Sequence, residues 1–479
     1  MNNIFKQNFL FYDYETFGIN PVLDKPAQFA CVRTDFNLKV ISQPVILYCY
    51  PPIDYLPNPK SVLITSITPQ LTLRLGLNES NFSKKIYFYL NKPNSCIIGY
   101  NNISFDDEIT RNIFYRNFFD IYSWSWKNNN TRWDVINVAR AFYALRPKGI
   151  KWPKNKDNIV SFKLSKLTQE NLINHTKSHD ALSDVYATIN LLKLFKKTNE
   201  KFFNFLFLIR KKKNILKLVN NYYLKSLIYI SNFYGSKKKN LGFVFPLTLH
   251  SEIKNILIVF DLDIDYSSKK SIKSFKNFNY DLNYLFCLGM KLIYLNKCPI
   301  LIPMTALRDS DIIRLKINTN QHKKNIIFLK KFMSFKKISK ISKISFKKIN
   351  YKHVDLRLYE KFFSYSDQKK INILRFFINQ NKFNDKIKIK DKRFSKLIFF
   401  FKARNFPRYL NIKEKILWIK YLKKIFHKKK ILKYKKKIYI LKKKYLSQQK
   451  KINLLNSLLN YLKYLKKSIQ IFQKSIFFK

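Results

Sequence analysis

Up to about residue 198, short apolar runs alternate with segments whose apolar residues recur at helical spacing. We predict strands over the apolar runs Phe9–Tyr14, Gln28–Thr34, Val45–Tyr50 and Ser95–Tyr100. We predict helices over the segments Glu79–Leu90, Asp106–Asn117, Trp133–Ala144 and Asp180–Lys196. This order favours an α/β domain in which helices flank a sheet that opens with a three-stranded meander.

The pattern changes after this first part. Short β-rich pieces, separated by clusters of Ser, Asn and Lys, follow at Leu227–Ile230, Asn255–Asp261 and Lys291–Leu295. The next segment, Phe332–Ile349, is a Lys/Ser/Ile run that we expect to be a solvated linker. Helical patterns then resume at Arg357–Phe363, Asp367–Ile378, Phe394–Arg404 and Lys413–Phe426, and long Lys-rich helices run to the end. We therefore predict three domains, at residues 1–198, 199–352 and 353–479.

A chain of 479 residues with 46% hydrophobic residues is long enough for two or three packed cores. Its formal net charge of +64 has two explanations. One is a polyanionic partner, either nucleic acid or an anionic membrane surface. The other is an AT-rich genome, which would inflate Lys, Asn, Ile, Phe and Tyr and leave few Gly (7) and Met (4). The charge alone therefore does not establish nucleic-acid binding.

The five cysteines form no Cys-x-x-Cys pair, and three of them lie in apolar, strand-like runs. Buried free thiols are the expected state, which suits a reducing cytoplasm. The N-terminus shows no long apolar segment after its charges, so we expect no signal peptide. No stretch approaches the ~18 uncharged apolar residues of a membrane-spanning helix. We therefore expect a cytoplasmic protein that does not cross a membrane.

Four acids and one histidine stand out as candidates for chemistry: Asp13, Glu15, Asp106, His179 and Asp184. Asp13 and Glu15 are two residues apart at the end of an apolar run, so on a strand they share one face. His179 and Asp184 stand at the head of a helical pattern, where a five-residue offset separates side chains by about 140°. Asp184 could then face bound metals while His179 reaches the solvent side.

These residue types suit the cleavage of a phosphodiester. Two divalent cations about 3.5–4 Å apart neutralise the attacking and leaving oxygens in polymerases and nucleases, and such hard cations take carboxylate oxygens. A neutral histidine can accept the proton of the attacking water. The set therefore predicts a two-metal exonuclease acting at a 3′ end, with His179 as the general base.

Neighbouring residues compete with members of this set. Asp107 and Glu108 offer the same chemistry as Asp106. His175 competes with His179 for the role of the base, although the offset to Asp184 favours His179. Asp180 is interpreted as a helix cap.

Several longer strings carry a resemblance to a known family. They include Leu10-Phe-Tyr-Asp-Tyr-Glu-Thr-Phe-Gly18, Phe105-Asp-Asp-Glu-Ile-Thr-Arg-Asn-Ile-Phe-Tyr-Arg-Asn117, Ala144-Leu-Arg-Pro147, His179-Asp-Ala, Asn296-Lys-Cys-Pro299 and Ala403-Arg-Asn-Phe-Pro407. Through them the chain resembles, over nearly its whole length, the exodeoxyribonuclease I family of bacteria. That family belongs to the DEDDh exonucleases of the RNase H-like superfamily.

The resemblance implies an α/β exonuclease domain with an RNase H-like fold, then an SH3-like β domain, then a C-terminal α-helical domain. It also implies a monomeric enzyme that degrades single-stranded DNA processively from 3′ to 5′, releasing 5′-mononucleotides in DNA repair and recombination. Asp13, Glu15 and Asp184 would hold two Mg²⁺ ions, for which Mn²⁺ can substitute, and Asp106 would complete the set. The implied protein partner is single-stranded DNA-binding protein, whose acidic C-terminal tail would dock on a basic groove.

The resemblance also places substrate contacts on this chain. Glu15 and Lys163 would hold the terminal nucleotide, although the family usually has Arg at the position of Lys163, and Lys lacks the bidentate fork. The implied DNA contacts are basic, polar or aromatic side chains of the kind that bind phosphates or stack on bases. They are Arg111, Tyr122, Trp126, Arg140, Lys212, Asn255, Lys291, Tyr294 and Tyr359.

Two alternatives remain open on the sequence. An oligoribonuclease acting on short RNA, or a polymerase proofreading subunit, has the same five residues, but those proteins are short single domains or parts of other enzymes. A basic nucleic-acid-binding protein with a weakened active site is the alternative without catalysis, although all five residues are present here.

Overall fold

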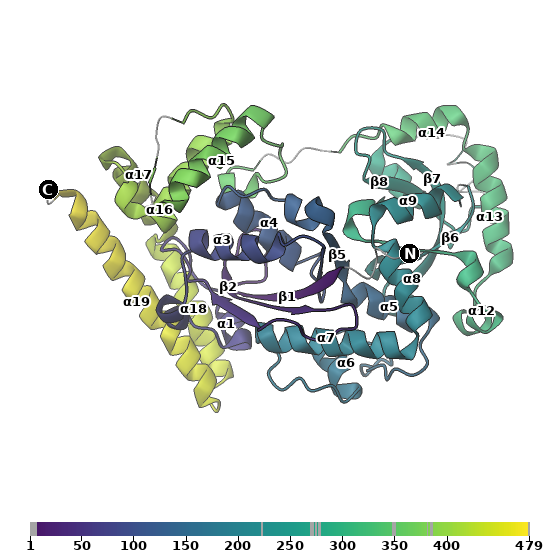
Figure 1. Cartoon of the computed structure of the whole chain (residues 1–479), viewed down its shortest axis with the longest axis horizontal. Helices are drawn as coiled ribbons and strands as arrows, with labels where there is room; N and C mark the ends of the chain where they lie inside the picture. Colours follow the sequence, from purple (N-terminus) through teal and green to yellow (C-terminus); the bar gives the residue numbers. More distant parts are fainter. Residues whose placement is uncertain are drawn as a thin grey trace.

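The molecule has three parts: a central α/β domain, a β-rich domain on one side of it and a helical domain on the other (Figure 1). The computed structural model describes residues 7–221, 224–268, 273, 275, 279–346, 351–380, 382–383 and 387–477. The order of these parts along the chain is the predicted one.

The central sheet has five strands in the order β3-β2-β1-β4-β5. They span β1 Asn8–Thr16, β2 Pro26–Thr34, β3 Val45–Tyr48, β4 Ser95–Gly99 and β5 Thr131–Asp134. The first three strands are antiparallel, which confirms the meander, whereas β4 runs parallel to β1, and β5 runs parallel to β4. A mixed sheet of this order, flanked by helices, is the expected α/β fold.

Helices flank this sheet, and four of them were predicted within a few residues. The helices of this domain span α1 Pro59–Thr65, α2 Pro69–Leu75, α3 Glu79–Leu90, α4 Asp106–Arg116, α5 Val135–Leu145, α6 Leu164–Glu170, α7 Ala181–Thr198 and α8 Glu200–Ile209, and the next helix, α9 Lys212–Asn221, lies with the β-rich domain (Figure 1). One start is wrong: Trp133 and Asp134 end β5 instead of opening a helix. Trp133 pairs with Ile98 in the sheet, and the Asp134 carboxylate caps α5 by accepting from the Ile136 N–H.

Helix α8 extends the core of the α/β domain. Phe207 contacts the rings of Phe9 and Trp133, and the Arg210 guanidinium donates to the Gln7 side chain. The predicted boundary at residue 198 therefore falls between two helices, α7 and α8, that share one apolar core.

The β-rich domain is a five-stranded antiparallel sheet in the order β10-β6-β7-β8-β9. Its strands are β6 Leu227–Ile230, β7 Leu241–Leu249, β8 Ile256–Asp261, β9 Met290–Tyr294 and β10 Ile300–Pro303. Its helices are α11 Leu282–Cys287, α12 Asp309–Leu315, α13 Thr319–Phe332 and α14 Phe335–Ser342. The three predicted β-rich pieces are β6, β8 and β9.

Helix α14 shows that the expected linker over Phe332–Ile349 is wrong. Ser334 caps the helix, and the side chains of Ile341 and Ile344 are buried, so isoleucines three residues apart anchor the segment, while Lys336, Lys340 and Lys343 are exposed. Residues 347–349 of that prediction lie outside the described residues.

The C-terminal part is helical, as predicted, with α15 Tyr365–Asn379, α16 Lys392–Asn405, α17 Ile412–Ile425, α18 Lys428–Lys444 and α19 Gln449–Phe477. The helix expected over Arg357–Phe363 is wrong. A single 3-10 turn ends at Leu356. The Arg357 carbonyl accepts from the Arg393 guanidinium at 2.8 Å and from the Glu360 N–H at 3.3 Å, so a turn stands where the helix was expected. The Lys-rich tail is ordered because Leu455 and Leu458 on α19 pack with Val62 of α1.

A buried ion network joins the helical domain to the α/β domain. Arg404 binds Asp54 through Nη2 at 2.9 Å and Asp355 through Nη1 at 2.7 Å, and all three side chains are at least nine-tenths buried. Beside it, the Arg116 guanidinium binds Glu79 through two hydrogen bonds of 2.9 and 2.7 Å. Burial by itself would raise the pKa of Glu79, but Arg116 and Lys25 lower it to about 2.

The neighbour of Arg404 completes this docking. The Asn405 side chain accepts from the Ser80 N–H at 3.0 Å, and the Asn405 carbonyl accepts from the Asn78 side chain at 3.2 Å. Both partners lie at the start of α3. The string Ala403-Arg-Asn-Phe-Pro407 therefore serves to attach the helical domain to the α/β domain.

Two further expectations concern the cysteines and membrane-spanning helices. The five cysteines are free; Cys31, Cys49, Cys96 and Cys298 are buried as expected, whereas Cys287 is exposed. In the part of the chain that the structure describes, every helix is too short or too polar to cross a bilayer.

Replacing Arg404 should weaken the attachment of the helical domain. Arg404→Met leaves the buried carboxylate of Asp54 without its cation and leaves Asp355 with the more distant Lys25 ammonium, at 3.8 Å, and breaking a buried pair costs about 3–5 kcal/mol. Urea unfolding followed by circular dichroism measures the loss. Arg408→Met is the matched control, because Arg408 is exposed four residues later in the same segment. Equal midpoints for the two variants would contradict this role.

Candidate active site

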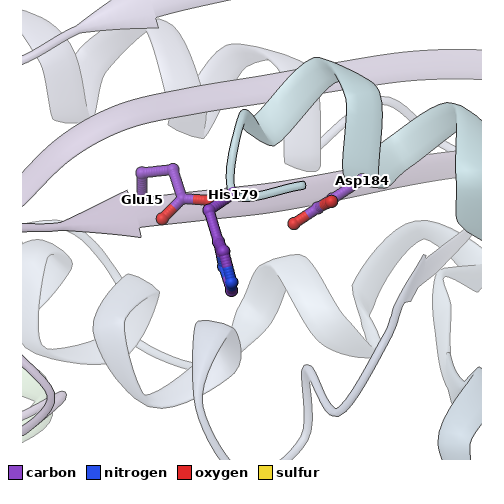
Figure 2. Close-up of side chains that lie close together, drawn as sticks. All are labelled: Glu15, His179 and Asp184. Carbon is purple, nitrogen blue, oxygen red and sulfur yellow. The ribbon is translucent and has the colours of Figure 1, made fainter. Parts of the chain in front are cut away.

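The candidate site forms where the end of β1 meets the start of α7. Asp13 and Glu15 share one face of β1, and a bulge in the pairing with β2 follows Glu15. Asp184 lies in the first turn of α7, which packs across β1 and β2. One ligand atom each from Glu15, His179 and Asp184 lie within 4.8 Å of one another. Figure 2 shows His179 between the two carboxylates.

His179 precedes α7 and is not part of it, so the predicted helical angle between His179 and Asp184 is wrong. Its backbone φ is +67°, a left-handed conformation, and its side chain is exposed. Asp180 is the helix cap, as predicted, and accepts from the Ser183 N–H at 3.1 Å. Gln28 on β2 accepts from the Ala181 N–H at 3.1 Å, which fixes the start of α7 against the sheet.

Asp106 approaches Asp13 from the start of α4. Its carboxylate is buried and accepts from the Tyr14 N–H at 3.1 Å. The preceding loop is tight: a Cβ on Gly99 would stand 2.7 Å from the Asn102 Cβ, so only glycine fits. Asn101 adopts a φ of +64°, and its N–H donates to Asp134 at 2.8 Å. This loop sets the position from which Asp106 reaches β1.

The site concentrates negative charge. Burial, together with Asp106 and Glu15, raises the pKa of Asp13 well above its ordinary range. Burial and Asp184 raise the pKa of Glu15 to about 8. Among the ion pairs of the described residues, none involves these two acids or Asp106. Carboxylate oxygens and an imidazole nitrogen, held together without a protein cation, suit a hard divalent metal ion.

His175 also reaches the site, although it was the less favoured candidate. Its Nε2 lies 2.5 Å from Asp184 Oδ1, and its Nδ1 lies 3.1 Å from Thr168 Oγ1. The His175 side chain is 4% exposed, unlike that of His179. His175 is therefore placed to orient Asp184, whereas His179 is placed where water has access. The link through Thr168 was missed, because Thr168 lies in α6, seven positions before His175, and the sequence does not show how the loop after α6 folds back.

The two acids that compete with Asp106 have other partners. Asp107 forms a buried ion pair with Arg132 of β5. Glu108 binds Arg111 of α4, and its other oxygen accepts from the Tyr359 hydroxyl of the helical domain. The preference for Asp106 therefore agrees with the geometry.

The predicted DNA contacts fall into groups. Tyr122 and Trp126 line a hollow of about 490 Å³ between the α/β and helical domains. The Arg111 guanidinium lies 5.5 Å above the Tyr122 ring, and Glu108 connects Arg111 to Tyr359. Trp126 is 66% exposed, so one face is free for stacking.

A second group lies in the β-rich domain. The Lys212 ammonium donates to the Asn255 side chain, and the Asn255 carbonyl accepts from the N–H of Leu295, which follows the exposed Tyr294. Lys291, on the same strand as Tyr294, is instead paired with Asp261 at 3.0 Å.

The two remaining candidates lie near α5 and α6. The Arg140 guanidinium lies 6.0 Å from the Phe162 ring, and the next residue, Lys163, is exposed.

Comparison with known proteins places this geometry in a family. Residues 10–192 match the exonuclease family, residues 210–345 the exonuclease I SH3-like domain, and residues 352–465 the exonuclease I C-terminal domain. Exodeoxyribonuclease I of Buchnera aphidicola subsp. Schizaphis graminum is 47% identical over 488 residues, 99% of each chain. The chain belongs to the exodeoxyribonuclease I family. The Escherichia coli exodeoxyribonuclease I is 41% identical over 428 residues, covering 88% of this chain and 90% of that protein.

Solved exonuclease I structures agree. The E. coli enzyme in complex with a dA16 oligonucleotide has a TM-score of 0.87 at 39% identity, covering 96% of this chain and 100% of the other. A zinc-bound E. coli complex with single-stranded DNA has a TM-score of 0.85 at 38% identity and the same coverage. An SSB/exonuclease I structure has a TM-score of 0.87 at 38% identity, covering 96% and 99%. The chain is therefore an exodeoxyribonuclease with the predicted succession of exonuclease, SH3-like and C-terminal domains.

Divalent cations should stabilise this fold measurably. A cation relieves the repulsion among the site carboxylates, and at a hundred times its Kd it adds about 2.7 kcal/mol to the unfolding free energy. Thermal melts with Mg²⁺, with Mn²⁺ and with EDTA test this. Asp184→Asn should lose most of the shift in Tm, while Asp157→Asn, at an exposed loop position, should keep it. Equal shifts in both variants would place the bound ion elsewhere.

Proposed function

We propose that this enzyme removes 5′-mononucleotides processively from the 3′ end of single-stranded DNA, in repair and recombination. The observation that carries the proposal is the convergence of Glu15, His179 and Asp184, beside Asp13 and Asp106, in a chain of this family. The relatives crystallised with single-stranded oligonucleotides support the choice of substrate. The short-RNA alternative finds no support in the two additional domains.

The residues divide the chemistry among them. Asp13, Glu15 and Asp184 would hold two Mg²⁺ ions, or Mn²⁺ in their place, and Asp106 would complete the acidic set. Such ions stabilise the charge that develops on the attacking and leaving oxygens. His179, on the exposed side of the site, takes the proton from the attacking water. His175 holds one oxygen of Asp184 and leaves the other free.

The substrate strand would leave the site along the predicted contacts. Glu15 and Lys163 would hold the terminal nucleotide, and the Arg140 guanidinium lies over the ring of Phe162, the residue before Lys163. Tyr122 and Trp126, which line the hollow beside the helical domain, would bind the following nucleotides together with Arg111 and Tyr359 next to Tyr122 and Glu108. Lys212, Asn255, Lys291 and Tyr294 would do so on the SH3-like domain. Contacts on three domains would retain the strand between successive cuts.

The remaining proposals concern the cellular setting. We expect a monomer that works in the cytoplasm. Single-stranded DNA-binding protein is the proposed partner, supported by the SSB/exonuclease I structure. A hollow of about 400 Å³, whose lining includes Arg146, Lys201, Phe202 and Phe205, would suit an acidic, partly apolar tail.

End-labelled DNA tests the activity as a whole. With Mg²⁺, the enzyme should release 5′-mononucleotides at once from 3′-labelled single strands, while a 5′ label is released last. EDTA should stop the reaction, and blunt duplex should be a poor substrate. A trap of unlabelled DNA should not interrupt digestion of bound strands. Rapid release of the 5′ label, or preferential digestion of short RNA, would overturn the proposal.

Removing a metal-binding carboxylate should separate cutting from binding. Asp13→Asn or Asp184→Asn should abolish cleavage, because each removes a ligand charge. Affinity for single-stranded DNA, measured by fluorescence anisotropy, should stay close to that of the parent, since most affinity comes from phosphate and stacking contacts elsewhere. Near-parental turnover in either variant would contradict the assignment.

The two histidines should respond differently. His179→Ala should lose roughly 10²–10⁴-fold in rate, the usual effect of removing a general base, with partial recovery at high pH, where hydroxide needs no base. His175→Ala should instead raise the metal concentration needed for half activity, because Asp184 loses its orienting partner, and excess Mg²⁺ should restore the rate. The reverse pattern would make His175 the base.

A further inference from the structure

Asp107, the neighbour of Asp106, has a role that the catalytic proposal does not use. It is fully buried, and three groups bind its carboxylate. The Tyr12 hydroxyl donates to Oδ1 at 2.5 Å, the Asn102 amide donates at 3.3 Å, and Arg132 forms the ion pair with Oδ2. A buried carboxylate with this set of partners is fixed in position, because any movement would leave a charge unpaired in the core.

Contacts on either side of Asp13 join its strand to the helix that carries Asp106. Tyr12 and Tyr14 flank Asp13 on β1, and both bind the start of α4. The Tyr12 hydroxyl binds Asp107, and the Tyr14 N–H binds Asp106. Strand β1 and helix α4 are thereby joined on either side of Asp13. The distance between the carboxylates of Asp13 and Asp106 depends on this pair of links.

Arg132 carries the link into the SH3-like domain. One amino group of its guanidinium binds Asp107, while the other donates to the Asn296 carbonyl at 2.5 Å. The Cys298 thiol in turn donates to the Arg132 carbonyl at 3.2 Å. Asn296 and Cys298 belong to the string Asn296-Lys-Cys-Pro299, which follows β9 and contains no candidate for catalysis. The Asn296 carbonyl and the Cys298 thiol instead hold Arg132 in place on β5, the edge strand of the central sheet.

We propose that Asp107 and Arg132 are positioning residues for the metal-binding carboxylates, and that the SH3-like domain completes the active site by holding Arg132 through the Asn296 carbonyl. The proposal rests on the proposed metal-dependent function and adds to it the residues that set its geometry. It also assigns the SH3-like domain a part in chemistry, separate from any contact with DNA. The spacing of the carboxylates would then depend on whether the SH3-like domain is docked against the α/β domain.

Metal binding without turnover tests this directly. Calorimetric titration of the full-length protein with Mn²⁺, in the absence of DNA, should show affinity weakened roughly 10-fold in Arg132→Met and in Asp107→Asn, within the range seen for outer-shell partners of metal ligands. Arg132→Lys keeps the charge beside Asp107 but has no second amino group for Asn296, so it should fall between Arg132→Met and the parent. The single-turnover cutting rate at saturating DNA should fall in the same order, with DNA affinity unchanged.

Arg33→Met is the matched control, because Arg33 lies on β2 of the same sheet and binds Ser95 and the Tyr89 carbonyl, away from the acids. It should bind Mn²⁺ as the parent does. If Arg132→Met does not fold, Arg132→Lys decides by the same titration. Parental Mn²⁺ affinity in the folded Arg132 variants would overturn the proposal and reduce the ion pair to a stabilising contact. If the parent itself bound no Mn²⁺, the proposed function would fail instead.

Discussion

Mutual repulsion among buried carboxylates is the constraint on which this structure depends. Asp13, Glu15, Asp106 and Asp184 come from a strand and two helices that are distant in sequence. In the part of the chain that the structure describes, no Lys or Arg side chain pairs with any of them, and only His175 contacts the Asp184 carboxylate. Much of the surrounding architecture resists that repulsion. The tight loop at Gly99, the Gln28 contact to α7 and the links from β1 to α4 each hold one acid against its neighbours. A rigid acidic cluster is what a divalent cation requires, because the binding energy is then not spent on gathering ligands.

The sequence was informative where local pattern and burial agree. Strands β1 and β2 and helices α3 and α7 were predicted because apolar periodicity, turns and caps all indicated the same element. The failures occur where tertiary contacts decide. Trp133 and Asp134 have the apolar spacing of the helix that follows, yet parallel pairing with β4 draws them into a strand. Arg357–Phe363 has helical composition, but the Arg357 carbonyl binds the Arg393 guanidinium of α16 and closes a single turn with the Glu360 N–H.

In the candidate site too, the residue types were predictable from the sequence, whereas the tertiary contacts were not. The five residues were identified from their types, their order and a family resemblance, and the structure brings Glu15, His179 and Asp184 together. The local pattern gave the wrong backbone for His179, because a residue before a capped helix may adopt a left-handed turn that helical spacing does not reveal. Partners such as Thr168 for His175, or Arg132 for Asp107, join segments that only the folded chain makes adjacent. Lysine-rich composition likewise concealed α14, whose few buried apolar residues suffice to hold it.

The contact between Arg132 and the SH3-like domain uses a main-chain oxygen, that of Asn296. Every amino acid presents such an oxygen, so residue replacement at this position does not remove the acceptor as long as the turn keeps its shape. The domain can therefore change its surface charge and its side chains over evolutionary time while the acceptor stays in place. What selection must preserve there is a backbone path, including the left-handed conformation at Cys298, with φ +47°, and not a particular set of functional groups.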